Sequence, residues 1–93
     1  MTTAELSALR DEIRDLDREF VELIARRVEL ARRIGEAKRE AGIATLDPAR
    51  EAAVVRDAAD RAREAGLDAD EVRAIFWRLI GLCRRTQQAE AAS

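Results

Sequence analysis

The most constraining feature of this chain is an apolar stripe that runs through its first forty residues. Its members recur in steps of three and four residues, the spacing that gathers side chains on one face of an α-helix. They are Leu6, Leu9, Ile13, Leu16, Phe20, Leu23, Leu30, Ile34 and Ala37. A helix over about 3–41 extends roughly 55 Å at 1.5 Å per residue. Two shorter helices cannot cover that length, so the stripe is expected to pack against a second chain.

Local signals set the limits of this long helix. We expect Thr3 to cap its start and Gly42 to end it, because threonine is a good N-cap and glycine commonly follows the last helical turn. Gly35 lies inside the span, but the apolar period continues through it. One continuous helix is therefore predicted.

Two further helices are expected, over about 48–65 and about 69–89. Asp47 precedes a proline, an arrangement typical of a helix start, and Asp68 with Glu71 has the spacing of a capping box. The polar tail beyond the third helix is expected to fray. The prediction is a single all-α domain over residues 1–93, with three helices, one of them very long.

Composition supports oligomerisation and excludes several classes of function. A chain of 93 residues buries little core by itself, so a partner subunit is the expected source of further stability. One cysteine permits no intrachain disulfide, and the absence of histidine removes the commonest metal ligand and general base. A metalloenzyme or a Ser-His hydrolase is therefore not expected.

Charge and hydropathy predict a cytoplasmic protein. The 17 basic and 19 acidic side chains are interspersed and form no broad basic field, so nucleic acid is not an expected partner. No stretch approaches the roughly 18 apolar residues of a membrane span, and the N-terminus resembles neither a signal nor a transit peptide. The basic pairs at 32–33 and 84–85 are interpreted as solvated helix faces.

Four polar residues interrupt the apolar faces: Arg27, Lys38, Glu51 and Gln87. Each alone has an ordinary explanation, such as an arginine whose stem packs while its head reaches water, or a charge that complements a helix dipole. Together they leave two cations and an amide facing the interior without assigned partners. Because an unpaired buried charge costs several kcal/mol, a bound small polyanion is the hypothesis that satisfies them all.

The spacing of the basic residues indicates where this anion would bind. Arg27 and Lys38 are three helical turns apart, about 16 Å along the axis and nearly on one side, so their long side chains could converge on it. Arg10 lies about 25 Å before Arg27 and is rotated by roughly 100°. Arg10 could reach such a site only from the partner of an antiparallel pair, and it is equally compatible with an exposed helix start.

Four segments in order resemble the all-helical chorismate mutases, and the resemblance covers nearly the whole chain. They are LxxLRxEIxxLD at 6–17, the run LIARRVELARRIGEAK at 23–38, DxxRE at 47–51 and TQQ at 86–88. The resemblance implies an intertwined homodimer that forms a six-helix bundle, with two active sites built from both chains. It also implies a small dicarboxylate substrate, no cofactor and no metal.

The same resemblance implies roles for individual residues. Arg10 resembles the arginine donated across the dimer and Arg27 the arginine within the site, both of which would bind substrate carboxylates. Lys38 looks like the lysine that contacts a carboxylate and the ether oxygen, and Gln87 like the donor to that same oxygen. Lys38 and Gln87 are therefore the candidate catalytic residues.

Four further residues resemble the rest of the substrate-binding site. Asp47 and Glu51 look like the pair near the ring hydroxyl, and Arg50 like an adjacent supporting arginine. Cys83 stands where many relatives carry serine, and a thiol is a much weaker hydrogen-bond donor than a hydroxyl. One carboxylate contact therefore differs from the usual pattern.

The implied reaction, chorismate to prephenate, suits a chain without histidine or tyrosine. It is an intramolecular [3,3] rearrangement that needs no nucleophile and no proton transfer, only a substrate held in a reactive geometry and stabilised charge on the ether oxygen. Two alternatives stay open: a mutase for 4-amino-4-deoxychorismate in a specialised pathway, and a non-catalytic helical dimerisation module. A related elimination, isochorismate pyruvate lyase, has no specific support.

Overall fold

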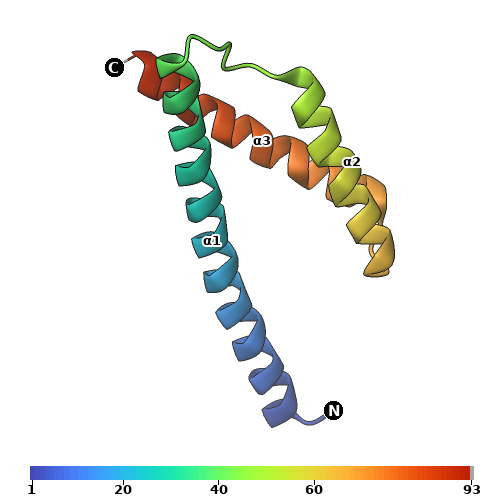
Figure 1. Ribbon diagram of the computed structural model, residues 1–93. Coiled ribbons are helices and arrows are strands. Elements are labelled where there is room, and N and C mark those ends of the chain that lie inside the picture. Colours follow the sequence, from blue (N-terminus) through green and yellow to red (C-terminus); the bar gives the residue numbers. More distant parts are fainter. Residues whose placement is uncertain (93) are drawn as a thin grey trace.

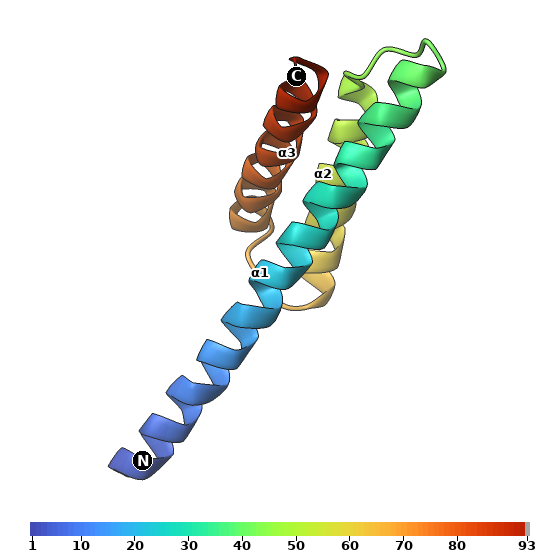
Figure 2. The same cartoon turned by 90° about the vertical axis from the view of Figure 1, so that its left-hand side faces the viewer.

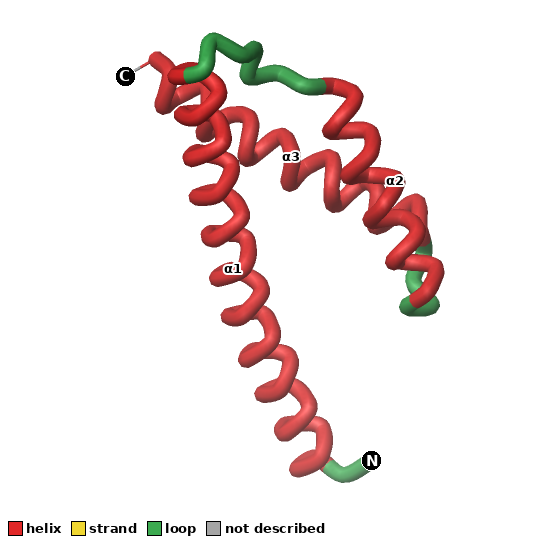
Figure 3. The backbone as a smooth tube through the Cα atoms, in the orientation of Figure 1, coloured by secondary structure: helices red, strands yellow, loops and turns green. Residues whose placement is uncertain are grey.

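The computed structural model describes residues 1–92 and contains three α-helices joined by short loops (Figure 3). The helices are α1 (Thr3–Glu40), α2 (Pro48–Glu64) and α3 (Ala69–Ala92). The expectation of an all-α chain with one very long helix is confirmed. The α3 helix continues to Ala92, beyond the expected end near residue 89. No helix within residues 1–92 is long and apolar enough to span a membrane.

The cap of α1 is Thr2, and the expectation that Thr3 fills this role is wrong. The Thr2 hydroxyl accepts a hydrogen bond from the backbone N–H of Glu5, and the Glu5 carboxylate accepts one from the backbone N–H of Thr2. This reciprocal capping box requires an acidic or amide side chain three residues after the cap. Thr3 has Leu6 at that distance, so only Thr2 can form it.

Two glycines end α1 and α2 in the same way. Gly42 has φ +70° and Gly66 has φ +75°, the left-handed conformation that costs residues with a Cβ about 1–2 kcal/mol. In each case the next residue donates a backbone hydrogen bond across the turn, from Ile43 to the Lys38 carbonyl and from Leu67 to the Ala62 carbonyl. The predicted end of the long helix at glycine is confirmed, and the first turn brings the chain back toward α2.

α3 lies between the other two helices and holds them together. It packs against α2 along much of its length and crosses the C-terminal half of α1, whereas the N-terminal half of α1 extends away from both (Figures 1 and 2). The most buried apolar side chains are few and mostly small: Val55, Ala58, Ala59, Ala62, Ile80 and Cys83. The alanines allow α2 to approach α3 closely, but they supply little buried area.

The crossing of α1 and α3 is centred on Gly35, the only buried residue of α1. A Cβ at this position would lie 3.1 Å from Cγ of Gln87 in α3. Because carbon atoms seldom approach this closely, glycine is what allows Gln87 to lie against the α1 backbone. The helix tolerates glycine here, as the uninterrupted period predicted.

The apolar stripe of α1 is exposed in the single chain. Its large side chains range from 40% exposed for Leu6 to 61% for Leu16, and Phe20 and Leu30 lie between these values. The radius of gyration is 17.1 Å, whereas a compact domain of this length has about 12 Å. A contiguous exposed stripe of this size marks an interaction surface.

We expect the two helical glycines of α1 and α3 to respond differently to alanine. Gly81→Ala should stabilise the protein by up to about 1 kcal/mol, because alanine favours helix and the new Cβ meets only the mobile end of Arg85. Gly35→Ala should gain less, because Gln87 must move, and Gly35→Val should destabilise by about 1–3 kcal/mol. Urea unfolding at one fixed protein concentration measures the change in the free energy of unfolding. Equal changes for alanine at both glycines would contradict the close approach of Gln87 to Gly35.

Candidate active site

An open cleft of about 320 Å³ lies between the C-terminal half of α1, the first turns of α2 and the C-terminal half of α3. Leu30 and Ile34 of α1, Val54 of α2 and Ile80 of α3 form its apolar walls. Its polar lining contains four basic side chains, Arg27, Lys38, Arg50 and Arg84, and two acidic ones, Asp47 and Glu51. We call this hollow the basic cleft. Its size falls in the range of small-molecule sites.

Arg27 reaches the cleft from α1 and is held by Cys83 of α3. Its Nη1 donates a hydrogen bond to Cys83 Sγ at 3.1 Å. The thiol is buried, while the arginine is only partly buried. Sulfur is a weak acceptor, so this contact orients the guanidinium and leaves its positive charge largely uncompensated.

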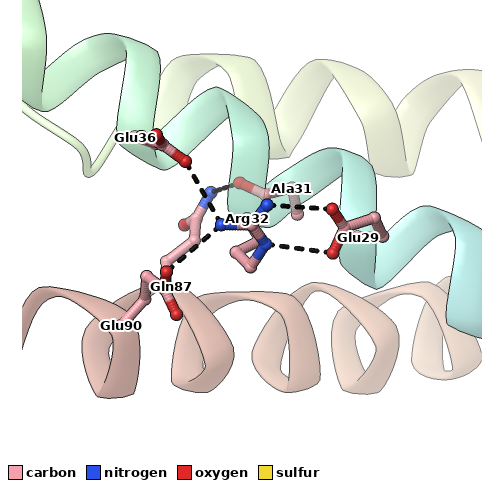
Figure 4. Close-up of polar contacts among 6 residues, drawn as sticks. All are labelled: Glu29, Ala31, Arg32, Glu36, Gln87 and Glu90. Carbon is pink, nitrogen blue, oxygen red and sulfur yellow. Dashed lines mark hydrogen bonds and ion pairs between the residues drawn. The ribbon is translucent and has the colours of Figure 1, made fainter. Parts of the chain in front are cut away.

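Gln87 lies across the crossing point of α1 and α3. Its Nε2 donates a 2.7 Å hydrogen bond to the Ala31 carbonyl (Figure 4). This bond fixes the amide at the edge of the cleft, directly against the close approach at Gly35. An amide carries a second N–H and an acceptor oxygen, so the bond to Ala31 does not use its full capacity.

Beside Gln87, Arg32 ties α1 to the end of α3. It donates to Glu29 and Glu36 of its own helix and to Glu90 of α3, at 2.9–3.2 Å (Figure 4). The two hydrogen bonds from Arg32 hold the pKa of Glu29 below its ordinary value. The expected partners of Arg32 one turn away are present, but its side chain is only 30% exposed and does not lie on a fully solvated face. The additional bond to Glu90 extends the ordered C-terminal turn of α3.

Lys38 and Asp47 lie where the connection between α1 and α2 closes over the cleft. Lys38 Nζ donates a long 3.4 Å hydrogen bond to the Thr45 carbonyl. The Asp47 carboxylate accepts a hydrogen bond from the backbone N–H of Arg50 at 3.1 Å and caps α2, as the sequence predicts. The Asp47 side chain therefore serves the helix start, and the lysine is only weakly held by the protein.

Glu51 and Arg84 form an ion pair across the cleft between α2 and α3. The expectation that Arg84 has its partner one turn away on its own helix is wrong: its side chain is 41% exposed, but its partner comes from another helix, and its Nε is buried with no hydrogen-bond partner in the described part of the chain. The spacing could have revealed it. Arg84 comes four residues after Ile80 and three before Gln87, so it shares the apolar face of α3.

The structure brings seven of the eight predicted site residues to one cleft. They are Arg27, Lys38, Asp47, Arg50, Glu51, Cys83 and Gln87. Arg10 is not among them, because it lies in the part of α1 that extends away from α2 and α3. The individual roles of these residues stay predictions.

Comparisons with known proteins agree with this site. Residues 9–88 match the family described as chorismate mutase type II. The chain is 36% identical over 75 residues to the T-protein of Haemophilus influenzae, covering 81% of this chain and 20% of that protein. It is 34% identical over 77 residues to the T-protein of Enterobacter agglomerans, covering 83% of this chain and 21% of that protein.

The chain thus spans about a fifth of the length of these curated relatives. The family match nevertheless extends from the first third of α1 to Gln88 in α3, and so includes every residue of the basic cleft. The resemblance inferred from four short segments is confirmed: this chain belongs to the chorismate mutase type II family.

Proposed function

We propose that this chain is an isomerase that converts chorismate to prephenate in aromatic amino-acid biosynthesis, acting as a homodimer with two shared active sites. The observation that carries the proposal is the charge of the basic cleft. Four basic side chains against two acidic ones give an excess of two positive charges, and chorismate carries two carboxylates. A cleft with this excess favours a dianion of matching size.

Arg27 and Lys38 bind the two substrate carboxylates. Within residues 1–92 the hydrogen-bond partner of the Arg27 guanidinium is a thiol, so its remaining N–H groups suit a bidentate contact with a carboxylate. Lys38 is held by one long hydrogen bond and supplies a second positive charge from the same helix. Fixing both carboxylates folds the enolpyruvyl arm over the ring, which is the geometry that the rearrangement requires.

Charge on the breaking ether oxygen would be stabilised by Lys38 and Gln87. Gln87 lies at the crossing of α1 and α3, where its bond to Ala31 immobilises it. Lys38 lies about one helical turn beyond Gly35, beside the connection to α2. A donor fixed before the reaction needs no reorganisation when the charge develops, which is why such groups contribute so much to rate. The carbon–oxygen bond breaks and a carbon–carbon bond forms within one molecule, so no proton has to be transferred.

The exposed apolar stripe of α1 supports the proposal that a partner subunit is present. Its large apolar side chains from Leu6 to Leu23 are 40–61% exposed in the single chain, and full burial of each leucine is worth about 1.5–3 kcal/mol. Antiparallel pairing of two α1 helices would bury these side chains and form a six-helix bundle. It would also carry Arg10 of each chain toward the basic cleft of the other, as the resemblance implies.

The first prediction concerns the proposed donor to the ether oxygen. Lys38→Ala should lower kcat by roughly a hundred- to a thousandfold, because a preorganised donor to the developing charge is lost. Arg33→Ala, an exposed basic residue of the same helix, should change kcat by less than about twofold. Chorismate disappearance followed by absorbance measures both, and similar losses would contradict the assignment.

A second prediction concerns the dimer. Leu16→Glu should weaken association by about a hundred- to ten-thousandfold, since each dimer loses two buried leucines, and should abolish activity at concentrations where it is monomeric. Arg18→Glu, on the opposite side of the same helix, should remain dimeric because its pair with Asp15 is exposed and contributes little. Sedimentation equilibrium decides, and a monomeric, active wild type would refute the proposal.

The third prediction tests whether Arg10 serves the other chain. Arg10→Ala and Arg27→Ala homodimers should each be nearly inactive. A heterodimer of the two variants, isolated with two different affinity tags, should regain about half of wild-type activity, because one of its two sites is intact when the arginines come from different chains. If both arginines of a site came from one chain, the heterodimer would be as inactive as its parents.

A further inference from the structure

Arg84 is a feature of the basic cleft that the proposed reaction does not use. Its guanidinium is bonded to the carboxylate of Glu51, whose side chain is only 19% exposed. Its Nε is buried without a partner in residues 1–92, an arrangement that stability alone does not favour. The Arg84 side chain is 41% exposed as a whole, so it lines the open cleft with its Nη2 bound to Glu51 and its Nε enclosed.

Charge attraction determines which part of the substrate lies near Glu51. The two substrate carboxylates are drawn to Arg27 and Lys38, which have no carboxylate partner within residues 1–92, so the neutral ring hydroxyl is the group left for the part of the cleft where Glu51 is paired with Arg84. Asp47 already accepts a hydrogen bond from the backbone of α2. Glu51 is therefore the carboxylate positioned to accept a hydrogen bond from the ring substituent.

The ion pair with Arg84 determines what charge that substituent can carry. A free Glu51 carboxylate in a partly buried position would attract an ammonium group strongly. With Arg84 bound, the local charge is compensated, and an ammonium group would meet the guanidinium at close range. A hydroxyl group needs only an acceptor oxygen, which Glu51 still offers through the second oxygen of its carboxylate.

We infer that Arg84 is a specificity-determining residue, which restricts the cleft to a substrate with a hydroxyl group on the ring and rejects the analogue with an ammonium group. This inference rests on the proposed function, because it concerns the ring substituent of the same substrate. The positive charge of this one side chain would distinguish chorismate from 4-amino-4-deoxychorismate.

The test compares kcat/KM for these two compounds in the dimeric protein. Arg84→Met keeps an unbranched apolar stem and removes the charged guanidinium, so it should lower the ratio of chorismate to amino-analogue turnover at least tenfold. Arg84→Gln is a polar alternative that can be used if the methionine variant folds poorly. It should also lower the ratio of chorismate to amino-analogue turnover. Arg85→Met, one residue on and exposed, should leave the ratio unchanged.

A double substitution separates this role from a structural one. If Arg84 acts through the Glu51 carboxylate, then adding Glu51→Gln to Arg84→Met should abolish the gain for the amino compound. A parallel loss of both activities in Arg84→Met, with an unchanged ratio, would overturn the inference while leaving the mutase function intact. A wild-type protein that converts neither compound would overturn the proposed function and the inference together.

Discussion

The close crossing of α1 and α3 at Gly35 is the contact on which the rest of the structure depends. Because glycine leaves no Cβ, Gln87 can lie against the α1 backbone and donate to the Ala31 carbonyl, and Arg32 can reach Glu90 one turn further on. This contact fixes the angle between the two helices that carry most of the cleft. A larger residue at Gly35 would displace the amide and, with it, the geometry of the proposed donors. The position thus couples a packing requirement to a chemical one.

The length of α1 divides one helix between two tasks. Its C-terminal half packs on α3 and supplies Arg27 and Lys38 to the cleft. Its N-terminal half extends away from α2 and α3 and exposes the apolar stripe. A chain with so small a buried core gains stability most readily by covering that stripe with a copy of itself. In the proposed homodimer, folding, association and completion of the site would be one process, and the free energy of unfolding would depend on protein concentration.

The sequence predicted what depends on periodicity and capping, and missed what depends on contacts between distant residues. The long helix, its end at Gly42 and the cap at Asp47 follow from local chemistry, and all three are present. The cap at Thr2 was missed because two threonines are adjacent, and only the position of Glu5 distinguishes them. Arg84 was missed because a neighbouring arginine suggested a solvated pair, although its partner is a carboxylate 33 residues earlier in the chain. The proposed role of Arg10 requires a second chain, so the structure of one chain does not test it.

The partners of the basic side chains explain why the cleft favours an anionic ligand. Two of its basic side chains have weak partners: Arg27 donates to a thiol and Lys38 makes a long hydrogen bond to a carbonyl. Neither forms an ion pair with a carboxylate within residues 1–92. A serine in place of Cys83 could donate a hydrogen bond to a substrate carboxylate, whereas the thiol mainly accepts from Arg27 and keeps it oriented. Arg84, by contrast, is paired with Glu51 and its charge is compensated. In the proposed function, Arg27 and Lys38 therefore supply the uncompensated positive charge that attracts a dianion, whereas the pair of Arg84 and Glu51 adds no net charge to the cleft.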